Sequence, residues 1–158
     1  MKITAQEEYG LRILVRIASC KDAAGITIPQ LSELEGLTSH YVAKLTRTLR
    51  IAGYINSTRG YKGGYVLAQP AEQIIIGRVL EALGGNLFDK KFCGTHAGSV
   101  RLCTNSVDCS VRSLWQIVQT SVDNVLDKIT LHHLVNPEKE SAMVLQQILQ
   151  QGLRAPVL

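Results

Sequence analysis

The feature that most constrains the fold is a pair of short helices separated by a glycine. Pro29 suits the first turn of one helix, Gly36 interrupts it, and Thr38 or Ser39 can cap the next. The side chains expected to face inward are Leu31, Leu34, Val42, Leu45 and Leu49. Helix, glycine turn and helix in this order predict a helix-turn-helix.

A basic hairpin follows directly. Tyr54–Ser57 and Tyr65–Leu67 are predicted strands, and the join at Thr58–Gly64 is rich in glycine and carries Arg59 and Lys62. The glycines alone are equally compatible with a simple tight turn, but their place after a helix-turn-helix favours a DNA-binding wing. The expected fold is therefore mainly α with a small β-wing, a winged helix-turn-helix.

The net charge of +4 is unevenly distributed. Residues 1–70 contain nine Lys and Arg against five Asp and Glu, whereas residues 71–158 contain eight of each. Residues 36–71 hold five cations and no acid. A solvated surface would usually mix signs, so this segment predicts binding to phosphate.

The second helix of the motif carries its polar residues off the apolar stripe, where they can point outward together. We expect base contacts in double-stranded DNA from Ser39, His40, Tyr41 and Lys44. We expect phosphate contacts from Arg47, Arg50, Arg59 and Lys62.

Helices are also predicted on both sides of this region. Thr4 and Glu7 have the spacing of a capping box, at the start of a helix that ends near Cys20, itself expected to be a small core residue. The inward positions of that helix should be Leu11, Leu14, Val15 and Ala18. Ile74–Leu83 has helical spacing and ends at two glycines.

A longer helix is predicted from Ser110 to about Ile129. Its apolar positions, in steps of three and four, are Val111, Leu114, Trp115, Val118, Val122, Val125, Leu126 and Ile129. Such a stripe can be buried within the monomer, but it is wider than a peripheral helix on a small domain needs. It predicts a dimerisation helix, followed by a segment, Thr130–Val135, that returns to the body.

Three of the four cysteines lie between the last two predicted helices. Cys93, Cys103 and Cys109, with His96 among them, occur where no sustained helical or strand period is present. Clustered thiols of this kind are typical of a metal or cluster site. From spacing alone, zinc bound by these four residues is as good an interpretation as an iron–sulfur cluster.

Other classes of protein fit the sequence poorly. The first 19 residues are too charged for a signal peptide, and no apolar run is long enough to span a membrane, so we expect a cytoplasmic protein. No nucleophile motif or phosphate-binding loop opening a helix is present, which argues against an enzyme. A dimeric adaptor or thiol-redox sensor that binds a partner protein remains an alternative.

Several segments in order resemble the Rrf2 family of bacterial winged-helix regulators, the IscR, NsrR and RirA group. These are MKITAQEEYGLRIL, YVAKLTRTLRIAGYI, STRGYKGGYVLA, SLWQIV and VLDKITLHHLV, which together span residue 1 to about 135. The resemblance implies a homodimeric regulator, a repressor of palindromic promoters, with an iron–sulfur cluster near its dimer helices that senses iron, redox or nitric oxide status. The corresponding divisions are a winged helix-turn-helix domain (1–83), a cluster loop (84–109), a dimerisation helix and return segment (110–135) and a tail (136–158) with at most a short helix.

The resemblance also implies the cluster ligands Cys93, Cys103 and Cys109. Where the IscR type has a histidine three residues after the last cysteine, this chain has Arg112, which stays protonated and cannot be a ligand. Glu8 aligns with the acidic ligand that, in the NsrR branch, comes from the other subunit, and His96 is the alternative fourth ligand. The long-helix pattern slightly favours a [2Fe-2S] cluster, and the carboxylate at Glu8 favours [4Fe-4S].

Overall fold

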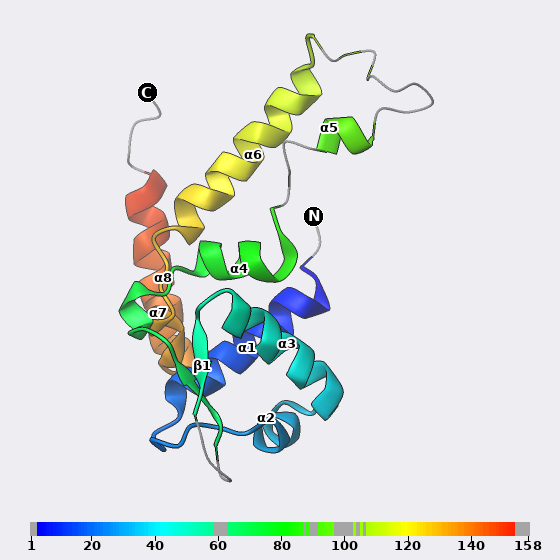
Figure 1. Cartoon of the computed structure of the whole chain (residues 1–158). Helices are drawn as coiled ribbons and strands as arrows, with labels where there is room; N and C mark the ends of the chain where they lie inside the picture. The colour runs from blue at the N-terminus through cyan, green and yellow to red at the C-terminus, as the bar shows by residue number, and fades with distance from the viewer. Residues whose placement is uncertain are drawn as a thin grey trace.

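The computed structural model describes residues 3–58, 63–86, 88, 92–96, 103, 105 and 107–153. Its elements in chain order are α1 (Ala5–Ser19), α2 (Ile28–Glu35), α3 (Ser39–Ile51), β1 (Ile55–Ser57), β2 (Tyr65–Leu67), the 3₁₀ turn η1 (Ala71–Gln73), α4 (Ile76–Gly84), α5 (Phe92–Thr95), α6 (Ser110–Leu126), α7 (His132–Val135) and α8 (Glu138–Leu153). Figure 1 shows a helical body that carries one small hairpin, and α6 projects from this body. The predicted class, mainly α with a β-wing, is confirmed.

The first helix begins with the predicted capping box. The Thr4 N–H donates to Glu7 Oε2 at 2.7 Å, and the Glu7 N–H donates to Thr4 Oγ1 at 3.3 Å. The buried face is Gly10, Ile13, Leu14 and Ile17, while Leu11, Val15 and Ala18 pack at its margin. A Cβ at Gly10 would lie 2.6 Å from the Leu83 side chain, so the absence of a side chain there lets α1 and α4 cross closely.

The helix-turn-helix forms as predicted, except that Glu35 is buried where Leu34 was expected. Gly36 ends α2 in the left-handed conformation (φ 65°), and Thr38 caps α3. The predicted inward residues Leu31, Val42, Leu45 and Leu49 are fully buried. The prediction for Leu34 is wrong: its side chain is 52% exposed, and the neighbouring Glu35 is buried in its place.

The wing is a two-stranded antiparallel hairpin in the register Ile55↔Leu67 and Ser57↔Tyr65. Tyr65 also exchanges two backbone hydrogen bonds with Ile26, of 2.9 and 3.1 Å, which attach the hairpin to the loop before α2. Gly64 is required at this junction, because a Cβ there would lie 2.7 Å from the Ile26 carbonyl carbon. The base of the wing is thus fixed, while Arg59 and Lys62 lie outside the described residues.

The segment after α6 returns to the body, as predicted. The Ile76 N–H donates to the Ile129 carbonyl, and the Leu131 N–H donates to the Ile74 carbonyl, each at 2.8 Å. Leu131 is fully buried in the same core as the helix-turn-helix. The segment that follows α6 is therefore hydrogen-bonded to the start of α4.

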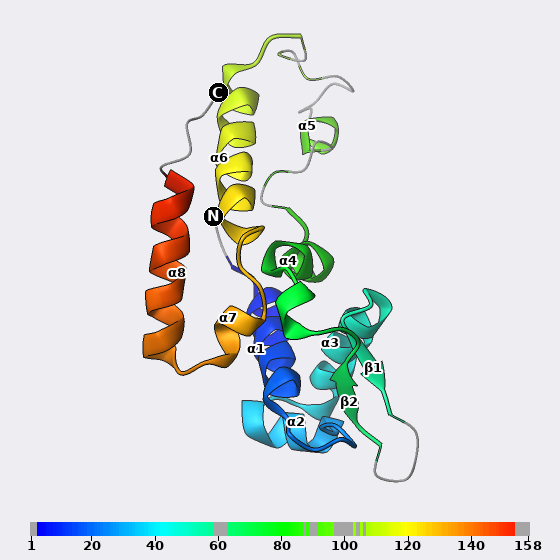
Figure 2. The same cartoon turned by 90° about the vertical axis from the view of Figure 1, so that its left-hand side faces the viewer.

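The N-terminal half of α6 extends beyond the body in both views (Figures 1 and 2). None of the residues of α6, all of which the structure describes, is buried, and four large apolar side chains are 47–64% exposed: Val111, Leu114, Trp115 and Ile117. Helix α8 is longer than the weak pattern predicted and packs alongside the lower part of α6 (Figure 2). Among the described residues, no helix is long and apolar enough to cross a membrane.

Candidate nucleic-acid interface and cysteine site

The outward face of α3 carries the predicted DNA-contacting residues. Ser39, His40, Lys44, Arg47 and Arg50 are all exposed. Thr38 caps α3, since its hydroxyl oxygen accepts the Tyr41 N–H at 3.3 Å, and Ser39 and His40 belong to the first turn, at the positive end of the helix dipole. The arrangement suits recognition of negatively charged phosphates beside base edges.

Tyr41 differs from the other predicted contacts. Its side chain is half-buried and packs against the core, and its ring lies edge-to-face against Tyr9 of α1, with 6.1 Å between ring centroids. Arg12 in turn lies 5.4 Å above the Tyr9 ring. Packing therefore restrains Tyr41, and its exposed edge is the part that remains for a base.

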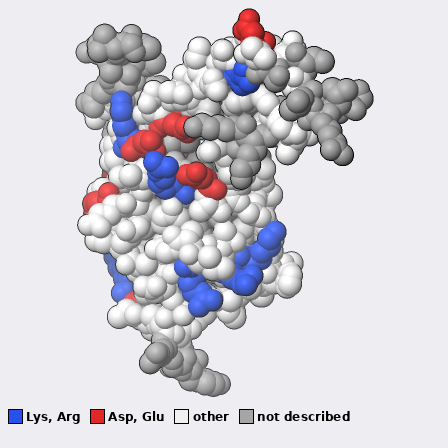
Figure 3. Space-filling model, turned by 45° about the horizontal axis from the view of Figure 1, so that its top comes forward, with Lys and Arg blue, Asp and Glu red and all other residues white. Residues whose placement is uncertain are grey.

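The acidic residues of α2 do not neutralise the basic face of α3. Glu35 is buried and accepts hydrogen bonds from Arg12 Nε at 2.7 Å and Arg16 Nε at 2.5 Å, so two cations neutralise it. Glu33 is the other acid of α2. Figure 3 shows Lys and Arg groups at the lower centre and lower right of the view with no acid beside them, and acids mainly in the upper part. The cluster of Glu35 with Arg12 and Arg16 was missed from the sequence, although arginines four residues apart on one helix face are a signal for a shared acid.

The cysteines are free thiols. Cys93 lies in α5, Cys103 follows in the connecting segment, and Cys109 is the N-cap of α6; all three are partly exposed, as is Cys20, which packs against the core. The Cys109 Sγ accepts the Arg112 N–H at 3.4 Å.

The described side chains do not bring three metal-binding groups of the His, Cys, Asp or Glu type together. The intervening residues 97–102, 104 and 106 lie outside the described part of the chain. The donor set itself, three thiols with an imidazole or a carboxylate, fits an iron–sulfur cluster and also fits zinc.

His96 and Glu8, the two candidate fourth ligands, occupy different parts of the molecule. His96 follows α5 and is exposed, three residues from Cys93. The Glu8 side chain is exposed on α1, where it lines a groove. Both views place α5 beside the projecting part of α6, well apart from α1 (Figures 1 and 2). Glu8 would therefore have to reach the cysteines of a second copy.

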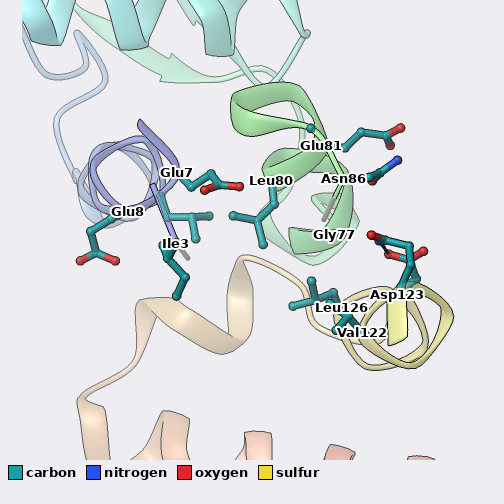
Figure 4. A pocket seen from close by; sticks show the side chains of 13 residues that line it. Ile3, Glu7, Glu8, Gly77, Leu80, Glu81, Asn86, Val122, Asp123 and Leu126 are labelled. Atoms are coloured by element: carbon teal, nitrogen blue, oxygen red, sulfur yellow. Dashed lines mark hydrogen bonds between the residues drawn. The ribbon is translucent and has the colours of Figure 1, made fainter. Parts of the chain in front are cut away.

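A groove of about 510 Å³ lies between α1, α4 and α6 (Figure 4). Apolar side chains of Ile3, Leu80, Val122 and Leu126 line it, and carboxylates of Glu7, Glu8, Glu81 and Asp123 also contribute. Sequence patterns did not reveal it, because its walls come from three helices far apart along the chain.

One tyrosine near this region is perturbed. Burial raises the pKa of the Tyr54 phenol above its ordinary value, and the Glu81 carboxylate raises it further, while Arg78 acts in the opposite direction. Arg78 and Glu81 also pair with each other at 3.3 Å.

Comparison with known proteins finds transcriptional regulators that are similar to this chain in sequence and structure. The chain is 28% identical to the transcriptional regulator IscR of Escherichia coli over 139 residues, covering 88% of this chain and 83% of that protein. The structure of CymR, the global cysteine regulator of B. subtilis, superposes with a TM-score of 0.65 at 30% identity, covering 85% of this chain and 96% of that one. T. potens IscR superposes with a TM-score of 0.64 at 29% identity, covering 84% of each chain.

These relatives are transcriptional regulators and not enzymes. The model of the Rrf2 family, described as iron-dependent transcriptional regulators, matches residues 3–137. The chain therefore belongs to the Rrf2 family of DNA-binding transcriptional regulators.

Proposed function

We propose that this regulator is a cytoplasmic homodimer that represses palindromic promoters, and that an iron–sulfur cluster controls its affinity for DNA. The observation that carries the proposal is the position of α6. Its N-cap is Cys109, its exposed half carries large apolar side chains, and the segment that follows it is hydrogen-bonded to the DNA-binding body.

The dimer interface in this proposal is centred on α6. Its exposed side chains Val111, Leu114 and Trp115 need cover from water, since contiguous apolar surface of this kind marks an interaction site. Val122 and Leu126, lower on the same helix, line the groove beside α1 and α4. The exposed stripe and the groove therefore form one apolar surface for a second copy of the chain.

Each copy would read one half-site. Ser39, His40 and Lys44 on α3 are exposed for base contacts, with the edge of Tyr41, and Arg47 and Arg50 are exposed for phosphates. Arg59 and Lys62 would add backbone contacts from the wing. Two copies related by two-fold symmetry place their α3 helices about 34–36 Å apart along a palindrome.

The cysteine site would hold the cluster through Cys93, Cys103 and Cys109 with a fourth ligand from Glu8 of a second copy or from His96. When bound, the cluster supplies a group whose charge and occupancy change with iron, redox state or nitric oxide. The nuclearity, [2Fe-2S] or [4Fe-4S], is part of the test. Zinc on the same residues is the alternative, because the donor set suits it equally.

The link from this site to DNA runs through α6. The Ile75–Thr130 bridge holds the residues after α6 against the start of α4. A Cβ at Gly77 would lie 2.9 Å from the Asp127 carboxylate, so the two helices are also in close contact here. A change in the angle of α6 would move the body that carries α3. Coupling of about 1–3 kcal/mol, or about 5–150-fold in affinity, is sufficient for a repressor to dissociate.

Anaerobic purification tests the proposal. We expect a coloured protein with stoichiometric iron and acid-labile sulfide, and promoter affinity that differs between the cluster-loaded and apo forms. A colourless protein that contains zinc would favour the alternative metal. Equal promoter binding with and without sulfide would refute control by the cluster, and no DNA binding at low salt in any form would favour an adaptor.

A further inference from the structure

We propose that His133 is a positioning residue of the joint between α6 and the DNA-binding body, and that it holds this joint only while its ring is neutral. The joint would then loosen as the pH falls, and the affinity of the protein for its promoter would fall with it. This inference rests on the proposed function in assuming that α6 and α3 are coupled through the joint.

The joint is the short segment that follows α6. The residues on either side of Thr130, Ile129 and Leu131, are hydrogen-bonded to the start of α4. The Thr130 N–H instead donates to the Nδ1 atom of His133 at 3.1 Å. The His133 N–H in turn donates to the Thr130 carbonyl oxygen at 3.1 Å, so the two residues are bonded reciprocally. The His133 side chain therefore supplies the acceptor for an amide at the centre of the joint.

The same arrangement occurs at two other helix starts of the chain. The Thr4 N–H donates to Glu7 Oε2 at 2.7 Å, and the Thr27 N–H donates to Gln30 Oε1 at 2.8 Å. In such capping boxes, a Glu or Gln side chain accepts the N–H of the residue three positions earlier. At the start of α7 a histidine ring takes this place. An amide oxygen or a carboxylate accepts hydrogen bonds throughout the physiological pH range, whereas an imidazole nitrogen accepts them only while it is unprotonated.

The hydrogen bond from Thr130 fixes the protonation state of His133. A backbone N–H can only donate, so Nδ1 must carry a lone pair, and the neutral ring has its proton on Nε2. The Thr130 hydroxyl lies 3.4 Å from the same nitrogen and can then only donate to it as well. Protonation of Nδ1 would place its N–H against the Thr130 N–H, and neither group could accept. Histidine is the side chain that changes charge between about pH 5 and 8, so the bond is lost within the physiological range.

Other charged groups surround α7, which packs on η1, α1 and α8 (Figure 2). His132 pairs with Glu72 of η1 at 3.2 Å, and its ring centroid lies 6.3 Å from that of His133. On α1, Glu7 and Glu8 line the groove, and the two arginines bind Glu35. The charged residues of α8 and of the segment before Thr130 are Asp127, Lys128, Glu138, Lys139 and Glu140. Among these residue types only histidine changes charge between about pH 5 and 8, so His132 is the neighbour that needs a control.

The place of the Thr130–His133 bond connects it to DNA binding. Leu131, the next residue of the joint, is fully buried in the core that also contains the inner face of α3. A looser joint would let α6 vary its angle to this core. The two α3 helices of the proposed dimer would then match half-sites of fixed spacing less often.

The test compares the native full-length chain with His133→Gln and His132→Gln, all purified anaerobically and used at equal iron content. Glutamine at position 133 reproduces the Thr27–Gln30 pair, whose acceptor does not titrate. The first readout is nuclear magnetic resonance, which locates the imidazole proton and measures the hydrogen-exchange protection of the Thr130 amide. We expect Nδ1 to be unprotonated at about pH 8. From there to about pH 5.5, protection should fall at least tenfold in the native chain and in His132→Gln, but stay constant in His133→Gln.

The second readout is promoter affinity over the same pH range. We expect the native chain and His133→Gln to bind equally at about pH 8, and the native chain to bind at least fivefold more weakly at about pH 5.5. His40 on α3 also titrates, but it is present in both chains, so its effect cancels in their ratio. The inference is wrong if the two chains share one pH profile, or if His132→Gln removes the difference instead; the proposed function stands in either case.

Failure of the proposed function gives a different result. If no form of the protein binds DNA, control of a promoter is excluded, and protection of the Thr130 amide then decides the role of His133. Protection that falls with pH in the native chain but not in His133→Gln would support His133 as the residue that holds the joint. Equal protection in the two chains at every pH would overturn it.

Discussion

Replacing Glu35 with glutamine should lower the free energy of unfolding by about 2 kcal/mol, as worked from two charge-assisted hydrogen bonds. The carboxylate side chain is 2% exposed and binds Arg12 and Arg16 of α1, at 2.7 and 2.5 Å. Each such bond contributes roughly 1.5–3 kcal/mol in a protected site. Both arginine side chains are 45–49% exposed, so water replaces part of what they lose, which reduces the expected total.

Glutamine keeps the shape of the side chain but can accept only through its oxygen. One arginine then retains a partner, while the other faces an amide NH₂ group, which cannot accept its hydrogen bond. At a cost of about 2 kcal/mol, the melting temperature of a chain of this size should fall by about 4–8 °C. Arg12→Gln and Arg16→Gln should each cost less than Glu35→Gln, because the remaining arginine still neutralises the carboxylate.

The assay is urea unfolding of the native chain and the variants at one protein concentration, since dimerisation would otherwise change the apparent stability. Glu33→Gln, an exposed acid on the same helix, is the matched control and should change the stability by less than about 0.5 kcal/mol. A Glu35→Gln variant as stable as this control would refute the view that the buried carboxylate fastens α2 to α1.

Three further predictions follow from exposed or perturbed side chains. Trp115→Glu should raise the dimer dissociation constant at least tenfold, about 1.4 kcal/mol, in sedimentation equilibrium, and an unchanged constant would place the interface elsewhere. Arg47→Gln should reduce the slope of log affinity against log salt by about 2 per dimer, one phosphate in each half-site, whereas an unchanged slope would remove Arg47 from the backbone contacts. Because burial raises the pKa of Tyr54, its stabilising contribution is complete below the unfolded pKa near 10 and is lost as pH rises through the folded value. Tyr54→Phe should remove that part of the alkaline loss in unfolding titrations, and an identical alkaline profile would contradict it.

The elements that the sequence predicted well are those set by local chemistry. The Thr4 capping box, the left-handed Gly36 and the stripe of Val42, Leu45 and Leu49 all depend on residues within one or two turns of each other. Caps and short-range periodicity act through the nearest backbone groups, so no tertiary information is needed to recognise them.

The inversion of Leu34 and Glu35 shows what local pattern could not provide. In a helix of eight residues the inward face is defined by only two or three positions, and a rotation of one residue exchanges an apolar for an acidic side chain. Here the ion pairs from Arg12 and Arg16 stabilise the carboxylate on the inner side. Their contribution depends on the crossing of α1 and α2, which the sequence does not display.

The candidate cysteine site could be located from the sequence, but the relative positions of its cysteines could not be predicted. Thiol clustering identified Cys93, Cys103 and Cys109, yet the segment has no period from which to derive their mutual positions. The ring stack of His96 on Phe92 and its contact with the Phe92 carbonyl arise from one short helical turn that periodicity did not reveal. The groove between α1, α4 and α6 is likewise a product of tertiary packing.

In the proposed mechanism, the length of α6 would amplify a small structural change at the cysteine site into a larger displacement at the other end of the helix. A helix of 17 residues is about 25 Å long, so a tilt of about 5° at one end displaces the other by about 2 Å. Cys109 is at one end, and the hydrogen bonds from Ile76 and Leu131 lie just beyond the other. Those two bonds and the buried Leu131 join the base of α6 to the core that supports α3. In the proposed dimer the body would therefore turn with the helix, and the two recognition helices would lose their register with the half-sites together.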